Sequence, residues 1–145
     1  MNTSQKNLFI LRRPLLFVCV VMFFSVGFGQ ELNTSEYKHN YKSASDFYRI
    51  SEYRKAISKW GEAAKYSNSE YDKAKCYLNM GVTYKALSIL DSALYKYNEA
   101  EKILVELDSL RLLGRVYNNF GTLKLRSGAF NDAQYYFLLS LKLKE

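Results

Sequence analysis

The pattern of small and bulky residues in the stretch from Asn79 to Ala100 recurs in the stretch from Asn119 to Ser140. The equivalent positions hold Gly81 and Gly121, Leu90 and Phe130, Ala93 and Ala133, Tyr97 and Phe137, and Ala100 and Ser140. Residues spaced by four and then three positions, such as those at 93, 97 and 100, lie on one face of an α-helix. The recurrence of this helical pattern predicts a solenoid of stacked helix pairs, which is a binding scaffold.

Polar residues and glycine divide the rest of the chain into further helices. Helices are expected over residues 36–50, 52–66, 70–87 and 91–107, from residue 108 onwards, and over 131–145. Ser51 and Asp91 are the expected N-caps of the helices that follow them. Residues 67–69 form the clearest break, and Gly128 supplies a turn residue that tolerates positive φ.

These residues resemble the tetratricopeptide repeat (TPR), a helix pair with a fixed order of large and small residues. The second unit carries the pattern in Tyr77, Met80, Gly81, Tyr84, Ala93, Tyr97 and Ala100. The third carries it in Tyr117, Phe120, Gly121, Ala133, Phe137 and Ser140, with Lys124 where the family has an aromatic residue. A weaker first unit is suggested by Ala44, Phe47, Ala56, Trp60 and Ala63, with Asn40 and Ser43 where large residues belong.

The resemblance covers about residues 36–145, with repeats at about 36–68, 70–107 and 109–145. It implies an all-α, TPR-like α-solenoid of about three antiparallel helix pairs. Ala56 and Ala93 are 37 residues apart and Ala93 and Ala133 are 40 apart, whereas the family period is about 34. The excesses are close to one and two helical turns of about 3.6 residues each. They therefore predict longer helices of uneven length, and not irregular insertions.

The N-terminal segment has the pattern of a secretory signal peptide over residues 1–29, followed by a short polar lead-in over 30–35. Three basic residues precede the apolar run from Leu15 to Phe28, and Gly27 and Gly29 are small residues before a cleavage site. The run is shorter than the roughly 18 residues of a membrane-spanning helix. We therefore expect export to the periplasm or the extracellular space, and an uncleaved membrane anchor is the alternative.

The charge is mildly basic. The formal net charge is +7, and removal of residues 1–29 leaves 18 basic against 14 acidic residues. A nucleic-acid-binding domain usually shows clustered Lys and Arg together with a recognisable motif. We therefore expect no nucleic-acid partner for this segment.

The sequence carries no motif for catalysis, phosphate binding or metal ligation. His39 is the only histidine and is expected at the surface. Cys76 is the only cysteine after residue 29, and we expect it to be a buried apolar residue. We therefore expect a protein that is not an enzyme and that uses neither a metal nor a cofactor.

The resemblance also implies a binding groove, because the first helix of each TPR pair lines a concave surface. The positions carried over are Lys38, Tyr41, Ser45, Tyr48 and Arg49 in the first repeat, Lys75, Leu78, Asn79, Val82 and Lys85 in the second, and Arg115, Asn118, Asn119, Thr122 and Arg126 in the third. The set is rich in basic and amide side chains and holds no acidic residue, which suits an extended, acidic protein or peptide. The alternative is a solvated basic face with no ligand.

Tyrosines recur at helical spacing in the second and third repeats. They are Tyr84, Tyr95, Tyr97, Tyr117, Tyr135 and Tyr136. We expect core and inter-repeat packing for them, in preference to a stacking site for a ligand.

The function expected from these features is that of a non-catalytic, protein- or peptide-binding scaffold outside the cytoplasm. The final helix carries leucines on more than one face, although repeat arrays normally cover such a surface. Two readings of this helix stay open. In the first, the chain self-associates through the final helix. In the second, the chain is the truncated sensor region of a membrane-bound signalling protein, a histidine kinase or a DNA-binding transcriptional regulator, whose output domain is missing.

Overall fold

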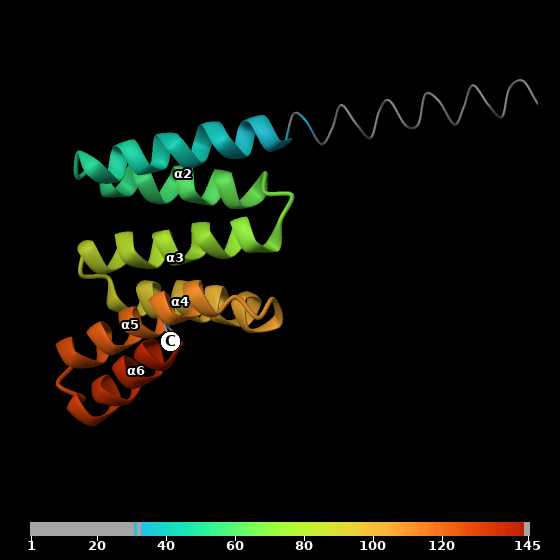
Figure 1. Ribbon diagram of the computed structural model, residues 1–145. Helices are drawn as coiled ribbons and strands as arrows, with labels where there is room; N and C mark the ends of the chain where they lie inside the picture. The colour runs from blue at the N-terminus through green and yellow to red at the C-terminus, as the bar shows by residue number, and fades with distance from the viewer. Residues whose placement is uncertain (1–30, 32, 144–145) are drawn as a thin grey trace, which may run out of the picture.

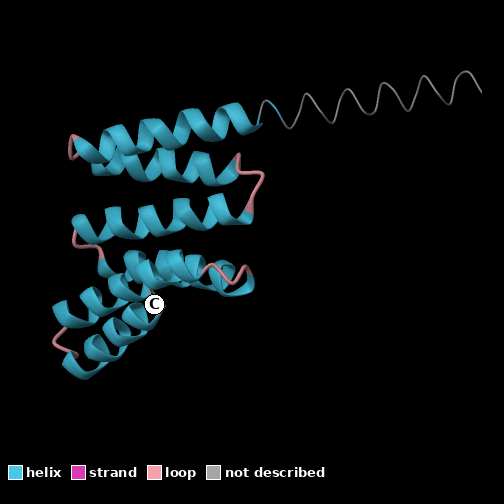
Figure 2. Cartoon of the chain, in the orientation of Figure 1, coloured by secondary structure: helices cyan, strands magenta, loops and turns pink. Residues whose placement is uncertain are grey.

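A computed structural model describes residue 31 and residues 33–143, and all regular secondary structure in this part of the chain is helical (Figure 2). The predicted signal peptide over residues 1–29 lies outside the described residues. The first helix spans residues 33–49, and it is followed by α2 (Tyr53–Lys65), α3 (Glu70–Ala86), α4 (Leu90–Glu106), α5 (Leu110–Arg126) and α6 (Phe130–Lys142). None of the described helices is both long and apolar enough to span a membrane.

The six helices form three antiparallel pairs, which confirms the predicted fold class. The first helix pairs with α2, α3 with α4, and α5 with α6, and consecutive pairs stack through α2 on α3 and α4 on α5. The stack runs from the N-terminal pair to the C-terminal pair, and the last pair is turned relative to the first (Figure 1). The structure is therefore a short TPR-like solenoid.

The longer period comes from longer helices, as the spacing predicts. The helices α3, α4 and α5 each contain 17 residues, whereas α2 contains 13. The turns that follow these three helices share one geometry, in which Ser88, Asp108 and Gly128 have φ values of 60°, 48° and 77°. In each turn the amide of the next residue bonds a carbonyl five residues back in the preceding helix, as Ala129 does to Lys124 at 2.9 Å. Gly128 thus occupies the predicted positive-φ position.

The helix starts differ from the predictions at three places. Residues 33–35, expected in the polar lead-in, are already helical. Ser51 is not an N-cap, because it takes a φ of 63° in the turn and Glu52 is the capping residue. Ile89 occupies the N-cap position of α4, which places Asp91 in the first turn. A carboxylate in the first turn still stabilises the helix, because it lies near the positive end of the helix dipole.

The apolar residues form two adjoining core clusters. The N-terminal cluster joins the first helix, α2 and α3 through Ala44, Ala56, Trp60, Ala63, Ala64, Cys76 and Met80. The second cluster joins α3, α4 and α5 through Leu78, Tyr97, Leu104, Leu112, Val116, Phe120 and their neighbours. The predicted inward positions of the first repeat, Ala56, Trp60 and Ala63, are all buried.

Asn40 is a polar residue at a core position of the first repeat, and its side chain is satisfied by two hydrogen bonds. Asn40 is buried, and its side-chain amide donates to the carbonyl of Glu36 at 3.0 Å. Its side-chain oxygen accepts a hydrogen bond from the Lys59 ammonium at 3.1 Å. Asn40 therefore joins the first helix to α2 by a hydrogen bond where other repeats use apolar packing.

Gly81 and Gly121 occupy equivalent surroundings, as the internal repeat requires. A Cβ atom added to Gly81 would overlap the ring of Tyr97, and one added to Gly121 would lie 2.6 Å from the ring of Phe137. Each glycine therefore lets the aromatic residue of the second helix lie directly on the backbone of the first. Tyr97 is completely buried, whereas Phe137 is half-buried.

The tyrosine prediction is correct for part of its set. Tyr97 is buried, and Tyr84, Tyr117 and Tyr136 pack against the second core cluster. Tyr95 and Tyr135 are 59% exposed, so the expectation of core packing is wrong for them. Each lies two residues before a core position, 97 or 137, which is about 200° around the helix.

Candidate functional site

The first helix, α3 and α5 are the first helices of the three pairs, and their aligned sides form what we call the first-helix face. Side chains on this face contact each other across repeats, between residues 34 to 41 positions apart. The predicted groove residues divide into two clusters on this face and a set of exposed residues.

The N-terminal cluster brings together Tyr41, Lys75 and Asn79. The side-chain amide of Asn79 donates to the Tyr41 hydroxyl at 3.1 Å. The Lys75 ammonium lies 4.9 Å from the centre of the Tyr41 ring and 3.5 Å from the Tyr37 hydroxyl. The Tyr41 ring also meets the Trp60 ring edge-on, with centroids 4.6 Å apart. This cluster therefore joins the first two repeats and anchors the face to the core.

The second repeat also places a carboxylate on this face, although the predicted set contains no acidic residue. The Lys75 ammonium donates to Asp72 at 3.0 Å, and both side chains are about one-third exposed. Burial lowers the pKa of Lys75, but the hydrogen bond to Asp72 and the electrostatic effects of Tyr41, Asp72 and Tyr71 together outweigh it, and the pKa is raised. Lys75 is thus a cation whose charge is already paired within the protein.

The C-terminal cluster brings together Lys85, Asn119 and Arg126. The Lys85 ammonium donates to the side-chain oxygen of Asn119 at 2.7 Å. The Arg126 guanidinium donates to the backbone carbonyl of Lys85 at 3.2 Å. Burial lowers the pKa of Lys85, and the nearby charge of Arg126 lowers it further. These contacts hold α3 against α5, in agreement with the packing of the two helices.

The remaining predicted residues lie apart from these clusters. Lys38, Arg115 and Asn118 are exposed. Tyr48 lies beside Tyr53 at a centroid distance of 5.5 Å, and Arg49 forms an exposed ion pair with Asp46 at 3.2 Å. Both of these contacts lie within the first repeat, apart from the two clusters.

Four other predicted positions have backbone or core roles. The hydroxyls of Ser45 and Thr122 donate to carbonyls of their own helices, four residues back. Leu78 is 1% exposed and belongs to the core, so its predicted place in the groove is wrong. Val82 is half-buried against the same cluster. Leu78 precedes Asn79 by one residue, and the 100° between them turns its side chain into the protein.

The sequence prediction missed Tyr37, Tyr71 and Arg111. The Arg111 guanidinium lies 3.5 Å from the Tyr71 hydroxyl, and the Tyr71 ring lies 5.7 Å from the Lys75 ammonium. Each missed residue lies four positions before a predicted one, at 41, 75 or 115. The signal was therefore present, because extending each helical stripe by one turn would have included all three.

The described residues include one histidine and one cysteine. No group of three or more His, Cys, Asp and Glu residues in this part of the chain is placed to hold a metal ion. His39 is exposed, as predicted. Cys76 is completely buried as a free thiol, as predicted, and its burial raises the pKa of the thiol to about 12.

The burial of Cys76 predicts slow modification of the native protein. In a chain with Cys19 replaced by serine, a thiol reagent at neutral pH should react with Cys76 on the order of 100-fold more slowly than with a free thiol. Because the thiol pKa is raised from 9.0, its contribution to stability is present below pH 9 and is lost as the pH rises towards about 12. Rapid reaction in the absence of denaturant would contradict the buried position.

Comparison with known proteins places the fold. No protein-family model matches the chain, and no curated protein matches it. Among solved structures, the TPR domain of Arabidopsis FLU superposes with a TM-score of 0.71 at 13% identity, covering 76% of this chain and 95% of that one. The crystal structure of MamA matches with a TM-score of 0.63 at 23% identity and covers 77% of this chain. This chain spans only 60% of the MamA chain. These likenesses show that the described part of the chain has the fold of a TPR domain.

Proposed function

We propose that the protein is a non-catalytic scaffold that acts outside the cytoplasm and binds an acidic protein or peptide on the first-helix face. TPR-fold domains typically bind proteins or peptides. The observation that supports an acidic partner is a set of three exposed cations, Lys38, Arg115 and Arg126, on helices that line one face. No carboxylate of the described residues forms an ion pair with any of the three.

The structure changes which residues matter for this proposal. Lys75 is paired with Asp72, and Lys85 is half-buried against Asn119, so both residues chiefly stabilise the stack. Both the amide and the oxygen of the Asn119 side chain have partners within the protein, whereas Asn118 is exposed. The partner is therefore held by the three exposed cations, of which Arg126 also donates to the Lys85 carbonyl, with Asn118 available to bond a peptide backbone.

Reversing the charge of Lys38, Arg115 and Arg126 together to glutamate should weaken partner binding by at least about tenfold, because each attraction to a carboxylate becomes a repulsion. Binding to an array of extended acidic peptides measures the effect. The matched control reverses Arg54, Lys55 and Lys102 to glutamate, which changes the net charge equally at exposed positions on α2 and α4. Equal loss in both variants would indicate a non-specific charge effect and would contradict the proposal.

Export rests on the sequence pattern of residues 1–29 and has a direct test. The N-terminal residue of the protein recovered from the periplasm or the medium should be Gln30. A mature chain that still begins at Met1 would contradict cleavage, and an intact chain in the membrane fraction would support the uncleaved anchor.

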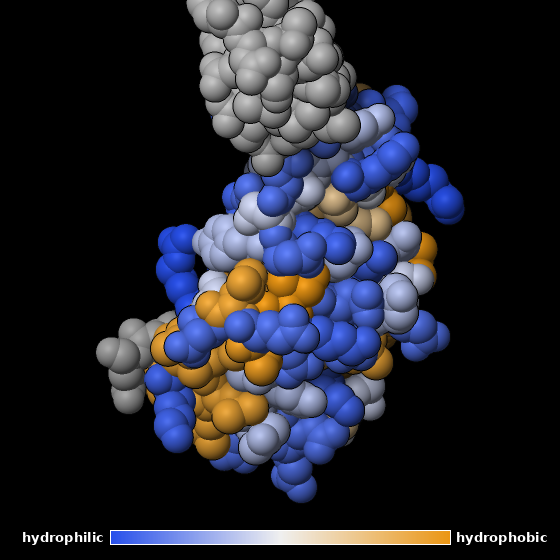
Figure 3. Space-filling view, turned by 90° about the vertical axis from the view of Figure 1, so that its right-hand side faces the viewer, coloured by the Kyte–Doolittle hydropathy of each residue, from blue (hydrophilic) through white to orange (hydrophobic). Residues whose placement is uncertain are grey.

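The exposed face of α6 supports the second candidate, the sensor region of a membrane-bound signalling protein. Leu138 and Leu141 are 58% and 56% exposed, although the equivalent positions of α4 hold the polar residues Asn98 and Glu101. In the space-filling view, apolar side chains gather in the lower part, which belongs to the C-terminal half (Figure 3). An apolar end of a stack suits packing against another domain or another copy.

This apolar end predicts self-association of the isolated segment. Light scattering should give a mass above that of the monomer at high protein concentration, and replacement of Leu138 and Leu141 by lysine should restore the monomer. A monomeric wild-type segment would contradict an interface on α6. The reading frame past Glu145 separates the two functions, because a membrane span followed by a kinase or DNA-binding domain supports the sensor.

A further inference from the structure

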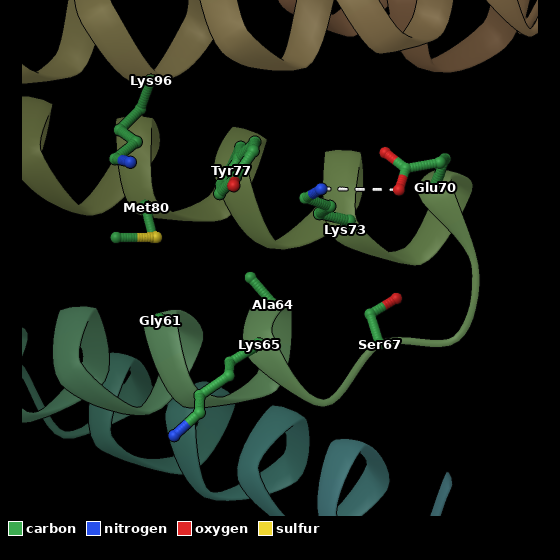
Figure 4. Close-up of a pocket in the computed structure, with 9 residues that line it drawn as sticks. All are labelled: Gly61, Ala64, Lys65, Ser67, Glu70, Lys73, Tyr77, Met80 and Lys96. Atoms are coloured by element: carbon green, nitrogen blue, oxygen red, sulfur yellow. Dashed lines mark hydrogen bonds and ion pairs between the residues drawn. The ribbon is translucent and has the colours of Figure 1, made fainter. Parts of the chain in front are cut away.

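A cleft of about 430 Å³ lies between α2 and α4, with α3 as its base (Figure 4). It is lined by Gly61, Ala64, Lys65, Ser67, Glu70, Lys73, Tyr77, Met80 and Lys96. On α3 the lining residues at 73, 77 and 80 lie about 180° around the helix from those at 75, 79 and 82. The cleft is therefore separate from the first-helix face, on the opposite side of the same helix. Its volume falls within the roughly 300–1,000 Å³ of small-molecule sites.

The cleft carries one more positive charge than negative charge at its centre. The Lys73 ammonium pairs with Glu70 at 3.4 Å. The Lys96 ammonium lies 4.7 Å from the centre of the Tyr77 ring, and no carboxylate of the described residues forms an ion pair with it. The Lys65 side chain turns away from α3, with its ammonium over the Tyr66 ring (Figure 4). The ammonium groups of Lys73 and Lys96 and the carboxylate of Glu70 together carry a net charge of +1. An anionic ligand would neutralise this charge.

Apart from Ser67, the rest of the lining is apolar. Ala64 and Met80 point into the space between α2 and α3, and the Tyr77 ring lies over α3 (Figure 4). Met80 is a flexible side chain that adapts to the shape of a neighbouring group. An apolar surface beside a positive charge suits a ligand with an apolar body and a single negative group.

Gly61 supplies an independent observation, because the fold does not require a glycine there. A Cβ atom added to Gly61 would meet no atom within 4 Å, whereas one added to Gly81, Gly114 or Gly121 would contact a neighbouring element. A glycine inside a helix is less favourable than alanine. The effect of Gly61 is to keep the wall of the cleft open, at a cost to the helix that no packing contact offsets.

We propose that this cleft binds a small organic monoanion, a carboxylate attached to an apolar body. The carboxylate pairs with the Lys96 ammonium beside the Tyr77 ring. The apolar body packs on Ala64, Tyr77 and Met80 and occupies the space beside Gly61. This site is independent of the partner proposed for the first-helix face.

A titration with 2-naphthoate tests the proposal, followed by the NMR signal of the Met80 methyl group. Met80 is the only methionine outside residues 1–29, so its signal is readily assigned. We expect a saturable shift of this signal at neutral pH. The neutral analogue 2-naphthamide should bind at least about tenfold more weakly, because it lacks the charge that the lysines attract.

Two variants locate the ligand. Lys96→Ala should weaken 2-naphthoate binding about tenfold. Gly61→Leu should abolish it by filling the cleft, while the melting temperature stays equal or rises. The control Lys102→Ala, on the same helix but paired with Glu99 outside the cleft, should leave the affinity unchanged. Absence of a saturable shift at millimolar 2-naphthoate, equal binding of the amide, or undiminished binding to Gly61→Leu would each overturn the proposal.

Discussion

Replacing Gly81 with alanine should destabilise the protein by about 2–3 kcal/mol, the upper part of the range for overpacking a core. The added Cβ atom would overlap the Tyr97 ring, and this ring cannot move aside. Tyr97 is completely buried, and the Phe120 ring meets it edge-on at a centroid distance of 5.8 Å. Denaturation by urea, followed by circular dichroism, measures the change in the free energy of unfolding.

Two further glycines provide the comparison. Gly121→Ala should cost less, about 1–2 kcal/mol, because the half-buried Phe137 ring can shift towards solvent. Gly61→Ala should stabilise the protein by up to about 1 kcal/mol, because the new Cβ meets no neighbour and alanine favours the helix. If all three replacements gave the same change, close contact between the helices of a pair would not be the cause.

Replacing Tyr97 with alanine should cost about 3–5 kcal/mol, the typical loss for a large buried aromatic side chain. Tyr97 contacts Gly81 within its own repeat and Phe120 of the next repeat, so its removal leaves a cavity between the second and third pairs. Phe137→Ala should cost less, because the equivalent ring is half-exposed. Thermal or urea denaturation of the two variants gives the comparison.

Tyr97→Phe separates the ring from its hydroxyl. The hydroxyl is buried and has no hydrogen-bond partner among the described residues, so its removal should leave stability unchanged or raise it by up to about 1 kcal/mol. A loss as large as that of Tyr97→Ala would mean that the hydroxyl is bonded and that the packing account of this residue is wrong.

The Tyr97 hydroxyl also predicts a pH dependence. Burial raises the pKa of Tyr97 above its ordinary value of 10.0. The stability contributed by this group is therefore present below pH 10 and is lost as the pH rises above it, since only the unfolded chain then ionises. The Tyr97→Phe variant should lose less stability than the wild type on the same alkaline titration.

The architecture was predictable because the repeat fixes which residues face inward. Gly81 with Tyr97, and Gly121 with Phe137, form the same contact in consecutive repeats, and the sequence shows these pairs at equal spacing. The longer helices were predictable because an excess of whole turns preserves the direction of the apolar face. Local propensity and tertiary packing agree at these positions.

The errors arise where side-chain identity does not determine position. Ser51 favours an N-cap, but the turn places it at positive φ and Glu52 is the N-cap instead. Tyr95 and Tyr135 are aromatic, but they lie on the outer sides of α4 and α6 and are exposed. Leu78 was assigned to the groove from its position relative to the family pattern, whereas its side chain is buried.

The candidate site was predictable as a set of positions but not as a set of free charges. The positions of Lys75, Lys85 and Asn119 on one face follow from helical periodicity. Their pairing with Asp72, or with each other, depends on side-chain geometry that the sequence does not specify. The structure therefore moves the proposed partner contacts to Lys38, Arg115 and Arg126.

The alignment of the first helices into one face has a direct measurement by NMR. Nuclear Overhauser effects should join the side-chain amide of Asn79 to the ring protons of Tyr41, because the amide nitrogen lies 3.1 Å from the Tyr41 hydroxyl oxygen. They should also join Lys85 to Asn119, whose side chains meet at 2.7 Å. Observation of both sets is the result that the account predicts. Their absence in a folded, helical protein would contradict the stacking of consecutive repeats and with it the proposed binding face.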